Sequence, residues 1–277
     1  MKISIVVPTL NRKDEVYALL QSLRENAGEI DFEVIIVDQN RNGLLNGLAK
    51  FFNDMSIRHY VVDFVGLSQA RNFGILKSQM PYIFFADDDM KFIFDSLNKA
   101  LNFLEENDDF VAIAGRMVDG NGDNSVGAFA RSAHELDVKK HFYGYFVESS
   151  MLFRKDIFAS YQFDENLGVG RFHGAEEGAD LILNLLKMGK RIYYDPEIKY
   201  YHPAVILSHE SDAAIKRVFF YRAGFALFCI KNHEYSRLIK RIFKVMIYLC
   251  FLTFIFSGKR RYYFAELLGL FSGIVIR

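Results

Sequence analysis

The chain has 277 residues, an apolar fraction of 51% and an aromatic fraction of 16%. This composition supports a sizeable folded core and excludes collagen-like, linker-rich and disordered chains. The formal net charge is zero, yet residues 231–277 hold nine Lys or Arg and only two acids. The end of the chain is therefore a basic block, which suits an anionic surface.

Two features bear on the cellular compartment. Cys229 and Cys250 are the only cysteines, too few for a disulfide framework in a chain of this length, so a reducing compartment is expected. The apolar run that ends at Pro8 is too short for a signal-peptide core or a membrane span. We therefore expect the catalytic part to stay in the cytosol.

Short β-rich runs alternate with helical patterns over the first 115 residues. In residues 14–26 the apolar residues recur at i, i+3, i+4 and i+7, which is one face of a helix. The pattern predicts strands at 3–7, 33–37, 58–62, 82–85 and 110–114, and helices at 14–26, 68–77 and 96–106. Such alternation is typical of a parallel sheet covered on both faces.

The rest of the chain is less regular. Residues 116–145 are rich in Gly, Asp, Asn and Ser and are predicted to form a long loop. Further strands are expected at 149–153, 191–195 and 198–201, and helices at 175–188 and 212–231. We predict a catalytic domain over residues 1–230 and a basic, apolar helical segment over 231–277.

Polar clusters follow three predicted strands, at the edge where ligands bind in open parallel sheets. The strongest is Asp87, Asp88 and Asp89. Three consecutive acids repel one another unless a cation lies among them, and their oxygens suit Mg²⁺ or Mn²⁺. A solvated acidic turn or an Asp-rich helix start is the alternative. The position after a buried strand favours a metal.

Five segments resemble the family 2 glycosyltransferases of the GT-A fold, and they occur in that family's order over about residues 1–203. They are ISIVVPTLNR (3–12), VIIVDQN (34–40), GLSQARNFGI (66–75), YIFFADDDM (82–90) and GVGRFHGAEEGADLILNLLKMGKRIYYDPEIKYYHP (168–203). The resemblance implies an α/β, Rossmann-like fold with a mixed, mainly parallel sheet flanked by helices. A C-terminal helical, membrane-associated segment would follow it here.

The resemblance also implies a site for a nucleotide-sugar donor. Asp38 would accept a hydrogen bond from a pyrimidine base, and Arg71 and Asn72 would lie near the ribose and diphosphate. The remaining nucleoside contacts would be Pro8, Thr9 and Asn11. The family's DxD motif, which binds the metal (Mn²⁺ or Mg²⁺) and the sugar nucleotide, would comprise Asp87, Asp88 and Asp89, with Asp88 as the x.

A second acidic segment, Glu176-Glu177-Gly178-Ala179-Asp180, would supply the general base for the acceptor hydroxyl. In the family a Glu-Asp pair commonly occupies this place with the Asp as base, but Gly178 stands there in this chain. We expect Glu177 to be the base, with Asp180 second and Glu176 third. The alternative is that these acids only favour a helix N-terminus. His202 is a candidate third metal ligand, although a lone His is more often structural.

The C-terminal segment contains two apolar runs, residues 245–256 and 262–276, with basic residues before and between them. The first is shorter than the roughly 20 residues of a membrane span, and Glu266 interrupts the second. We expect the segment to lie at an anionic membrane surface, on the cytoplasmic face of the cell membrane, as a peripheral or monotopic protein. Core helices, a dimer interface or a re-entrant hairpin are the alternatives.

Together these features predict an inverting, metal-dependent glycosyltransferase of bacterial surface-polysaccharide type. It would move a sugar from UDP or another pyrimidine nucleotide to a hydroxyl of a lipid-linked or polysaccharide acceptor, with no nucleic-acid partner. One alternative is a sugar-phosphate nucleotidyltransferase, which the absence of glycine from residues 8–12 disfavours. The other is an inactive nucleotide-binding membrane adaptor. The sugar, the linkage and the oligomeric state, including a homodimer, stay open.

Overall fold

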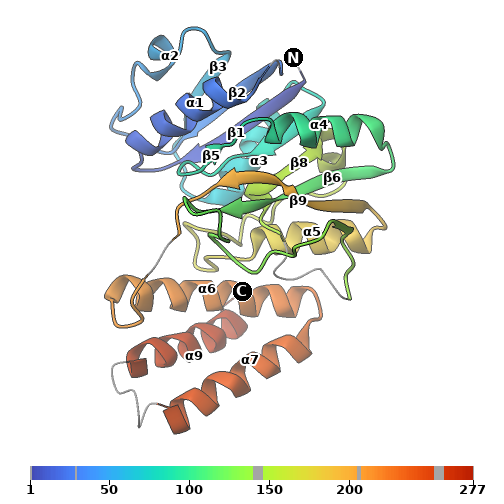
Figure 1. The fold of residues 1–277 in the computed structure, drawn as a ribbon. Coiled ribbons are helices and arrows are strands. Elements are labelled where there is room, and N and C mark those ends of the chain that lie inside the picture. The colour runs from blue at the N-terminus through green and yellow to red at the C-terminus, as the bar shows by residue number, and fades with distance from the viewer. Residues whose placement is uncertain (1, 29, 140–145, 205–206, 253–258, 277) are drawn as a thin grey trace. The chain divides into compact units, whose positions relative to one another are not determined.

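The structure is a computed structural model of the chain. It describes all residues except 1, 29, 140–145, 205–206, 253–258 and 277 (Figure 1). The chain divides into two compact units. The sheet unit comprises residues 1–64, 69–162 and 181–205, and the helical unit comprises residues 65–68, 163–180 and 206–277. The predicted domain boundary after residue 230 falls inside the helical unit, near the end of helix α6 (Asp212–Lys231).

The sheet unit is built on one sheet of nine strands, with the order β3-β2-β1-β4-β8-β6-β9-β5 and β7 paired to β9. The strands are β1 (Ile3–Thr9), β2 (Phe32–Asp38), β3 (Ile57–Val61), β4 (Tyr82–Phe85), β5 (Lys91–Phe92), β6 (Phe110–Val118), β7 (His134–Glu135), β8 (Met151–Arg154) and β9 (Arg191–Tyr201). The first four predicted strands therefore lie within one residue or two of their observed bounds.

The sheet is mixed, as predicted. The pairs β1–β2, β1–β4, β2–β3 and β6–β9 are parallel. Strand β8 runs antiparallel between β4 and β6, and the short strands β5 and β7 run antiparallel to β9. The insertion of β8 joins the predicted parallel half to the second half of the sheet.

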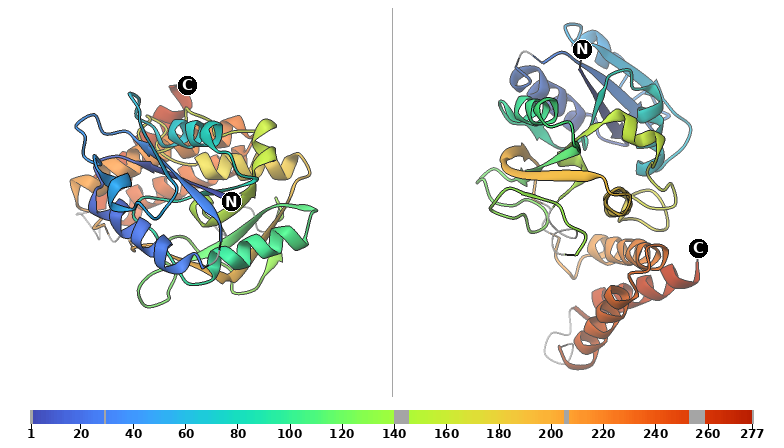
Figure 2. Two further views of the ribbon diagram at one scale, coloured as in Figure 1. Left: turned by 90° about the horizontal axis from the view of Figure 1, so that it is seen from above. Right: turned by 90° about the vertical axis from the view of Figure 1, so that its right-hand side faces the viewer.

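Helices cover both faces of this sheet (Figure 2). Helices α1 (Asp14–Asn26) and α4 (Ser96–Glu106) lie on one face, and α3 (Leu67–Lys77) lies on the other. Every residue of β1 is buried, as its β-branched sequence predicts for a strand packed on both sides. Helix α3 approaches β1 closely at Gly74, where a Cβ would lie 2.2 Å from Cγ1 of Val6.

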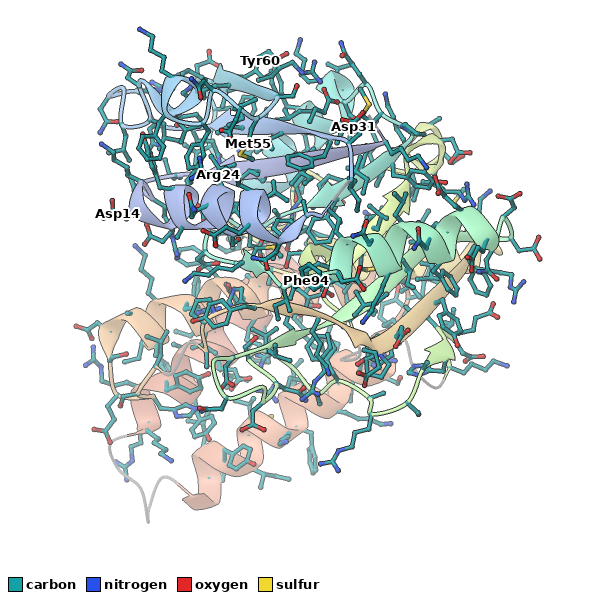
Figure 3. The ribbon with its side chains drawn as sticks, turned by 45° about the horizontal axis from the view of Figure 1, so that its top comes forward. Asp14, Arg24, Asp31, Met55, Tyr60 and Phe94 are labelled. Atoms are coloured by element: carbon teal, nitrogen blue, oxygen red, sulfur yellow. The ribbon has the colours of Figure 1, made fainter. Side chains whose placement is uncertain are left out.

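Helix α1 shows why its sequence forms a helix. Its apolar face, Val16, Leu19, Leu20 and Leu23, is buried. Asp14 lies in the first turn and Arg24 in the last, at opposite ends of the helix (Figure 3). Both charges oppose the partial charges of the helix ends and therefore stabilise them. A short helix, α2 (Leu48–Phe51), precedes β3.

Three predictions for the middle of the chain need correction. The predicted loop at 116–145 contains the end of β6 and all of β7, while its residues 140–145 lie outside the described part. The predicted strand at 149–153 is a 3₁₀ turn, η1 (Glu148–Ser150), followed by β8. The two strands predicted at 191–195 and 198–201 form the single strand β9, because a register shift against β6 accommodates the chain around Pro196.

The remaining described elements are η2 (Lys155–Ala159), α5 (Glu177–Lys187), α7 (Tyr235–Ile247), the π-helical turn η3 (Tyr248–Leu252) and α9 (Arg260–Val275). Within the helical unit α9 packs tightly against α6, since a Cβ on Gly273 would lie 2.3 Å from the carbonyl oxygen of Ala223. Among the described residues no helix combines the length and the apolarity needed to cross a membrane.

Candidate active site

The three consecutive acids form a tight turn directly after β4. The Ala86 N–H donates to the Val6 carbonyl at 2.9 Å and thereby extends the β1–β4 pairing, and the Met90 N–H donates to the Asp87 carbonyl at 3.2 Å. The side chains of Asp88 and Asp89 are mostly buried, while that of Asp87 is 28% exposed. The turn therefore holds the acids at the carboxyl end of β4, where ligands bind in such sheets.

Arg12 provides the first positive charge at this turn. Its Nη1 donates to Oδ2 of Asp89 at 2.7 Å, and its Nε lies 3.7 Å from Oδ1 of Asp88. The preceding Asn11 has a left-handed backbone with φ of 59°, which asparagine tolerates better than most residues. That bend after β1 brings Arg12 to the acids. Arg12 was not among the site residues predicted from the sequence.

His202 contacts the same turn from the end of β9. Its Nε2 lies 3.3 Å from Oδ1 of Asp89, and its Nδ1 lies 2.8 Å from the Pro203 carbonyl, to which it donates. Burial lowers the pKa of His202, but the hydrogen bond and charge of Asp89 outweigh it and the net pKa is raised. Conversely, burial raises the pKa of Asp89, and His202 and Arg12 outweigh that effect and lower it.

The pKa of Asp88 is shifted in the opposite direction to that of Asp89. Burial raises its pKa to about 7, the charges of Asp87 and Asp89 add to the rise, and the Thr9 hydroxyl and Arg12 oppose it. Asp88 thus loses its charge more readily than Asp89. The charge of Asp89 is stabilised by Arg12 and by the hydrogen bond of His202.

Arg71 is the second arginine at the turn, and its side chain is 1% exposed. Helix α3 carries it so that Nη2 lies 3.1 Å from Oδ1 of Asp87 and Nη1 lies 2.7 Å from Oε1 of Glu148. The structure therefore brings Arg71 to the acidic turn, while Asn72 follows it on α3 and is partly buried. The role of Glu148 was missed, because a single acid beside a predicted loop carries no sequence signal.

The predicted base-binding residues lie at the ends of β1 and β2. Thr9 and Asp38 are paired across the two strands, with Pro8 preceding Thr9 in β1. Asp38 is fully buried, and its Oδ1 accepts hydrogen bonds from both the backbone and the side-chain nitrogen of Asn40. Its Oδ2 lies 2.8 Å from Nε2 of His59.

Asn40 continues this network toward the acidic turn. Its Oδ1 accepts a hydrogen bond from the Asn11 N–H at 2.7 Å. The side chain of Asn40, which belongs to the polar cluster predicted after β2, and that of His59, which the sequence did not single out, thus orient Asp38 and the backbone before Arg12. The bonds of Asn40 to Asp38 are local, two residues apart, whereas those of His59 to Asp38 and of Asn11 to Asn40 depend on the parallel pairing of β1, β2 and β3.

The carboxylate oxygens at the turn are of the right kind for Mn²⁺ or Mg²⁺, and the imidazole nitrogen of His202 suits Mn²⁺ better than the harder Mg²⁺. The 3.3 Å between His202 Nε2 and Asp89 Oδ1 is close to the about 3 Å that separates neighbouring ligands of a small octahedral ion. However, the described residues include no group of three or more His, Cys, Asp or Glu arranged to hold a metal by themselves. The fit therefore requires ligand oxygens to complete the coordination.

The second acidic segment lies in the helical unit, where α5 begins. Glu176 adopts a left-handed backbone with φ of 76°, and Glu177, the first residue of α5, is 7% exposed. A Cβ on Gly168 would lie 3.2 Å from the carboxyl carbon of Glu177. This glycine therefore leaves room beside the predicted base.

Asp180 has contacts of another kind. It is fully buried, and its two oxygens accept hydrogen bonds from Nζ of Lys231 at 2.8 Å and from Nδ2 of Asn232 at 2.7 Å. Lys231 also binds Asp164 at 2.6 Å. These contacts tie α5 to the end of α6 and favour a structural role for Asp180. Its predicted catalytic role stays a prediction.

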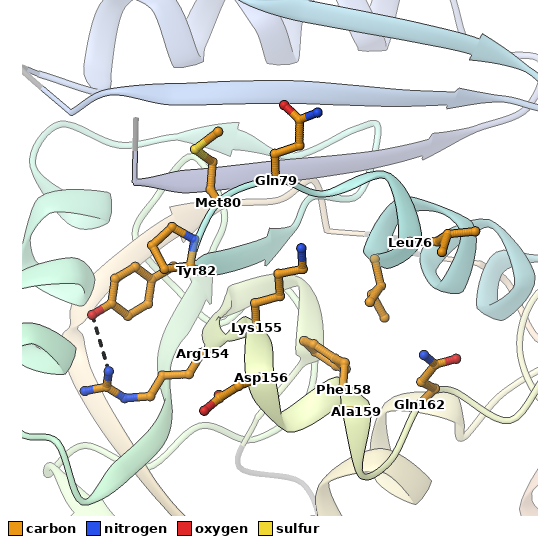
Figure 4. Close-up of a pocket in the computed structure, with 12 residues that line it drawn as sticks. Leu76, Gln79, Met80, Tyr82, Arg154, Lys155, Asp156, Phe158, Ala159 and Gln162 are labelled. Atoms are coloured by element: carbon orange, nitrogen blue, oxygen red, sulfur yellow. Dashed lines mark hydrogen bonds between the residues drawn. The ribbon is translucent and has the colours of Figure 1, made fainter.

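A cavity of about 780 Å³ lies at the opposite end of β4 (Figure 4). Tyr82, the first residue of β4, lines it together with Arg154, the last residue of β8, and Lys155, the first residue of η2. Arg154 Nη1 donates to the Tyr82 hydroxyl at 3.4 Å (Figure 4). Because this is the amino end of β4, the cavity is separate from the acidic turn.

Comparison with known proteins supports the resemblance read from the motifs. Over 125 residues the chain is 29% identical to the poly(ribitol-phosphate) beta-N-acetylglucosaminyltransferase TarP of Staphylococcus aureus, over 44% of this chain and 38% of TarP. In the sequence relatives matched first, the aligned segment covers only 15% to 38% of their length.

Solved structures show the same α/β, GT-A-like fold. The structure of S. aureus TarS 1–349 in complex with UDP-GlcNAc matches with a TM-score of 0.61 and 17% identity, over 98% of this chain and 91% of that one. The mannosyltransferase PcManGT of Pyrobaculum calidifontis, in complex with GDP-Man and Mn²⁺, matches with a TM-score of 0.63 and 12% identity, over 98% and 87%.

The family itself follows from the sequence match. Residues 4–162 match the model of Glycosyl transferase family 2, which is more than half of the 277 residues. That range contains β1, β2, β4 and the acidic turn, the elements whose geometry is described above. The chain therefore belongs to glycosyl transferase family 2.

Proposed function

We propose that this protein is an inverting glycosyltransferase that moves a sugar from a UDP-linked donor to an acceptor hydroxyl. One observation carries the proposal: two arginines, an imidazole and three carboxylates converge at the carboxyl end of β4. A diphosphate needs positive charge around it and a sugar needs polar partners, so this arrangement suits a nucleotide-sugar. The UDP-GlcNAc complex of TarS supports a UDP donor.

The chain's own residues would bind and orient the donor. Pro8, Thr9, Asn11 and Asp38 would surround the nucleoside at the ends of β1 and β2. Arg71 would stabilise the negative charge of the diphosphate, together with Arg12 on the other side of the acidic turn. Glu148 would keep the buried guanidinium of Arg71 pointed at Asp87, to which it is already bound.

Asp87, Asp89 and His202 would hold Mn²⁺ or Mg²⁺ together with oxygens of the donor. When bound, the ion would stabilise the leaving diphosphate as a Lewis acid. The Mn²⁺ complex of PcManGT supports this choice of ion. Asp88, whose pKa is raised, would contribute a hydrogen-bonding group to the turn with less negative charge than Asp89, whose pKa is lowered.

Glu177 would act as general base and take the proton of the acceptor hydroxyl as that oxygen attacks the anomeric carbon. The acceptor would belong to a lipid-linked or surface-polysaccharide glycan, and the enzyme would work on the cytoplasmic face of the cell membrane. The name of TarP, a poly(ribitol-phosphate) beta-N-acetylglucosaminyltransferase, supports a polymeric acceptor.

The test measures UDP release from a panel of UDP-sugars with purified full-length protein, with Mn²⁺ and then with excess EDTA. We expect the wild-type protein to turn over at least one donor. Turnover should fall more than 100-fold in Asp89→Asn, and by a similar factor when EDTA is added to the wild-type protein. Asp109→Asn is the matched control, because the Asp109 side chain is 82% exposed and pairs only loosely with Arg191 at 3.3 Å. Unchanged turnover in Asp89→Asn would contradict the proposal.

A further inference from the structure

Helix α7 leaves a row of large apolar side chains exposed. Tyr235, Ile239, Phe243 and Met246 are between 48% and 65% exposed, and their spacing of four, four and three residues places them on one face of the helix. We call this row the α7 stripe. Large contiguous apolar patches are rare on the surface of soluble monomers and mark interaction sites.

Another face of α7 packs within the helical unit, so the stripe is not the side by which the helix joins the core. Leu238 and Val245 are buried within the helical unit, so α7 already has a packed side. Arg241 also faces inward and binds Glu266 of α9, which Arg222 of α6 binds as well at 2.8 Å. The helix is thus held in its orientation, and the stripe remains on the outer side.

A basic band runs along the stripe. Lys240 and Lys244 are exposed and follow Ile239 and Phe243 by one residue each, so they border the stripe on the helix surface. The sequence contains no acid between Glu234 and Glu266. The surface therefore combines apolar side chains with positive charge that no nearby exposed acid of α7 neutralises.

Helix α9 repeats the combination. Phe264, Leu268, Phe271 and Val275 are between 44% and 80% exposed, at a spacing of four, three and four residues along one face. Arg260 and Arg261 begin this helix. Lys216 of α6 and Arg261 both line a shallow apolar groove of about 360 Å³ between α6 and α9. Helix α9 thus presents a similar apolar row, although its Arg261 is paired with Asp212 of α6 at 2.9 Å.

We propose that the helical unit docks on an anionic membrane surface, with the α7 stripe inserted among the lipid chains and its lysines at the headgroups. The charge complementarity favours a membrane as the partner. The apolar row matches the lipid chains, and the bordering lysines match the anionic headgroups. Helix α7 has 13 residues, which is too short to span a bilayer. It therefore lies in the plane of the interface.

The experiment is sedimentation of the full-length protein with vesicles of phosphatidylcholine alone or mixed with phosphatidylglycerol. We expect binding to the mixed vesicles and little to the neutral ones. Each lysine near an anionic surface contributes about fivefold in binding, so Lys240→Gln combined with Lys244→Gln lowers it about 30-fold. Phe243→Ser lowers it by roughly tenfold, since the ring leaves the lipid phase.

The matched control is Phe94→Ser. Phe94 is 72% exposed, like Phe243, but belongs to the sheet unit (Figure 3), and its substitution leaves vesicle binding unchanged. Circular dichroism and UDP release show that each variant is folded. The proposal is overturned if the wild-type protein does not bind the mixed vesicles. It is also overturned if Phe94→Ser lowers vesicle binding as much as Phe243→Ser does. Light scattering that shows a dimer of wild type and a monomer of Phe243→Ser, without vesicle binding, assigns the stripe to a second copy of the chain.

Discussion

Replacing Asp180 by Asn separates the two acids of α5 that compete for the role of general base. Asp180 is fully buried and accepts hydrogen bonds from Lys231 and Asn232. Its amide counterpart has the same shape but loses the negative charge. It also turns one hydrogen-bond donor toward Lys231 or Asn232, which are themselves donors. The substitution therefore removes one partner of an ion pair and leaves a hydrogen bond unsatisfied.

The magnitude follows from the burial of the pair. Removing one partner of a buried ion pair costs about 3–5 kcal/mol. The Lys231 side chain is 32% exposed and keeps its pair with Asp164 at 2.6 Å, so its remaining charge is partly compensated, and about 2–3 kcal/mol is expected here. For a chain of this size that corresponds to a fall of about 5–10 °C in Tm. Lys231→Met leaves the fully buried Asp180 carboxylate without this partner and should produce a fall at least as large.

The assay combines a thermal melt with UDP release at a temperature where all variants are folded. We expect Asp180→Asn and Lys231→Met to lower Tm and to keep turnover within about tenfold of wild type. Glu177→Gln, which preserves shape at the start of the same helix, should keep Tm within about 2 °C and lower turnover by more than 100-fold. An Asp180→Asn protein with wild-type Tm and no turnover would refute the reasoning and assign the base to Asp180.

Two further predictions concern the helical unit. Gly273→Ala should lower the free energy of unfolding in urea by about 1–2 kcal/mol, although alanine favours helices, because the added Cβ would lie 2.3 Å from the Ala223 carbonyl oxygen. The control is Gly120→Ala, where no atom lies within 4 Å of the added Cβ. A Gly273→Ala protein more stable than wild type would contradict the close packing of α9 against α6. Cys250 is exposed and should react with a disulfide reagent at pH 8 within minutes. Burial raises the pKa of the Cys229 thiol to about 12, so Cys229 should stay unlabelled until urea unfolds the chain. Equal labelling rates for the two thiols would contradict the burial of Cys229.

Local patterns in the sequence predicted most of the elements correctly. The helices at 14–26, 96–106 and 212–231 have the predicted bounds, because each carries a clear apolar face or run between polar ends. The strand at 82–85 is likewise confirmed. The predicted break in β9 was wrong, since a proline that normally ends a strand is accommodated there by a register shift against β6.

The candidate site was predicted only as far as its residues lie next to strand ends. Asp87, Asp88 and Asp89 follow β4 after the single residue Ala86, so the sequence places them at the ligand-binding edge without further information. The partners of these acids could not be predicted in this way. Glu148 reaches Arg71 across 77 residues of sequence, and no local pattern relates two such positions.

The sequence by itself therefore determined the alternation of strands and helices, the acidic turn after β4, the basic end of the chain and membership of the family. The periodicity of apolar residues and the order of short motifs carry this information locally. Only the tertiary structure decided which charges meet: Arg12 and His202 at Asp89, Arg71 between Asp87 and Glu148, and Lys231 at Asp180. Ion pairs depend on distances in space, and these arise only when strands and helices distant in sequence pack together.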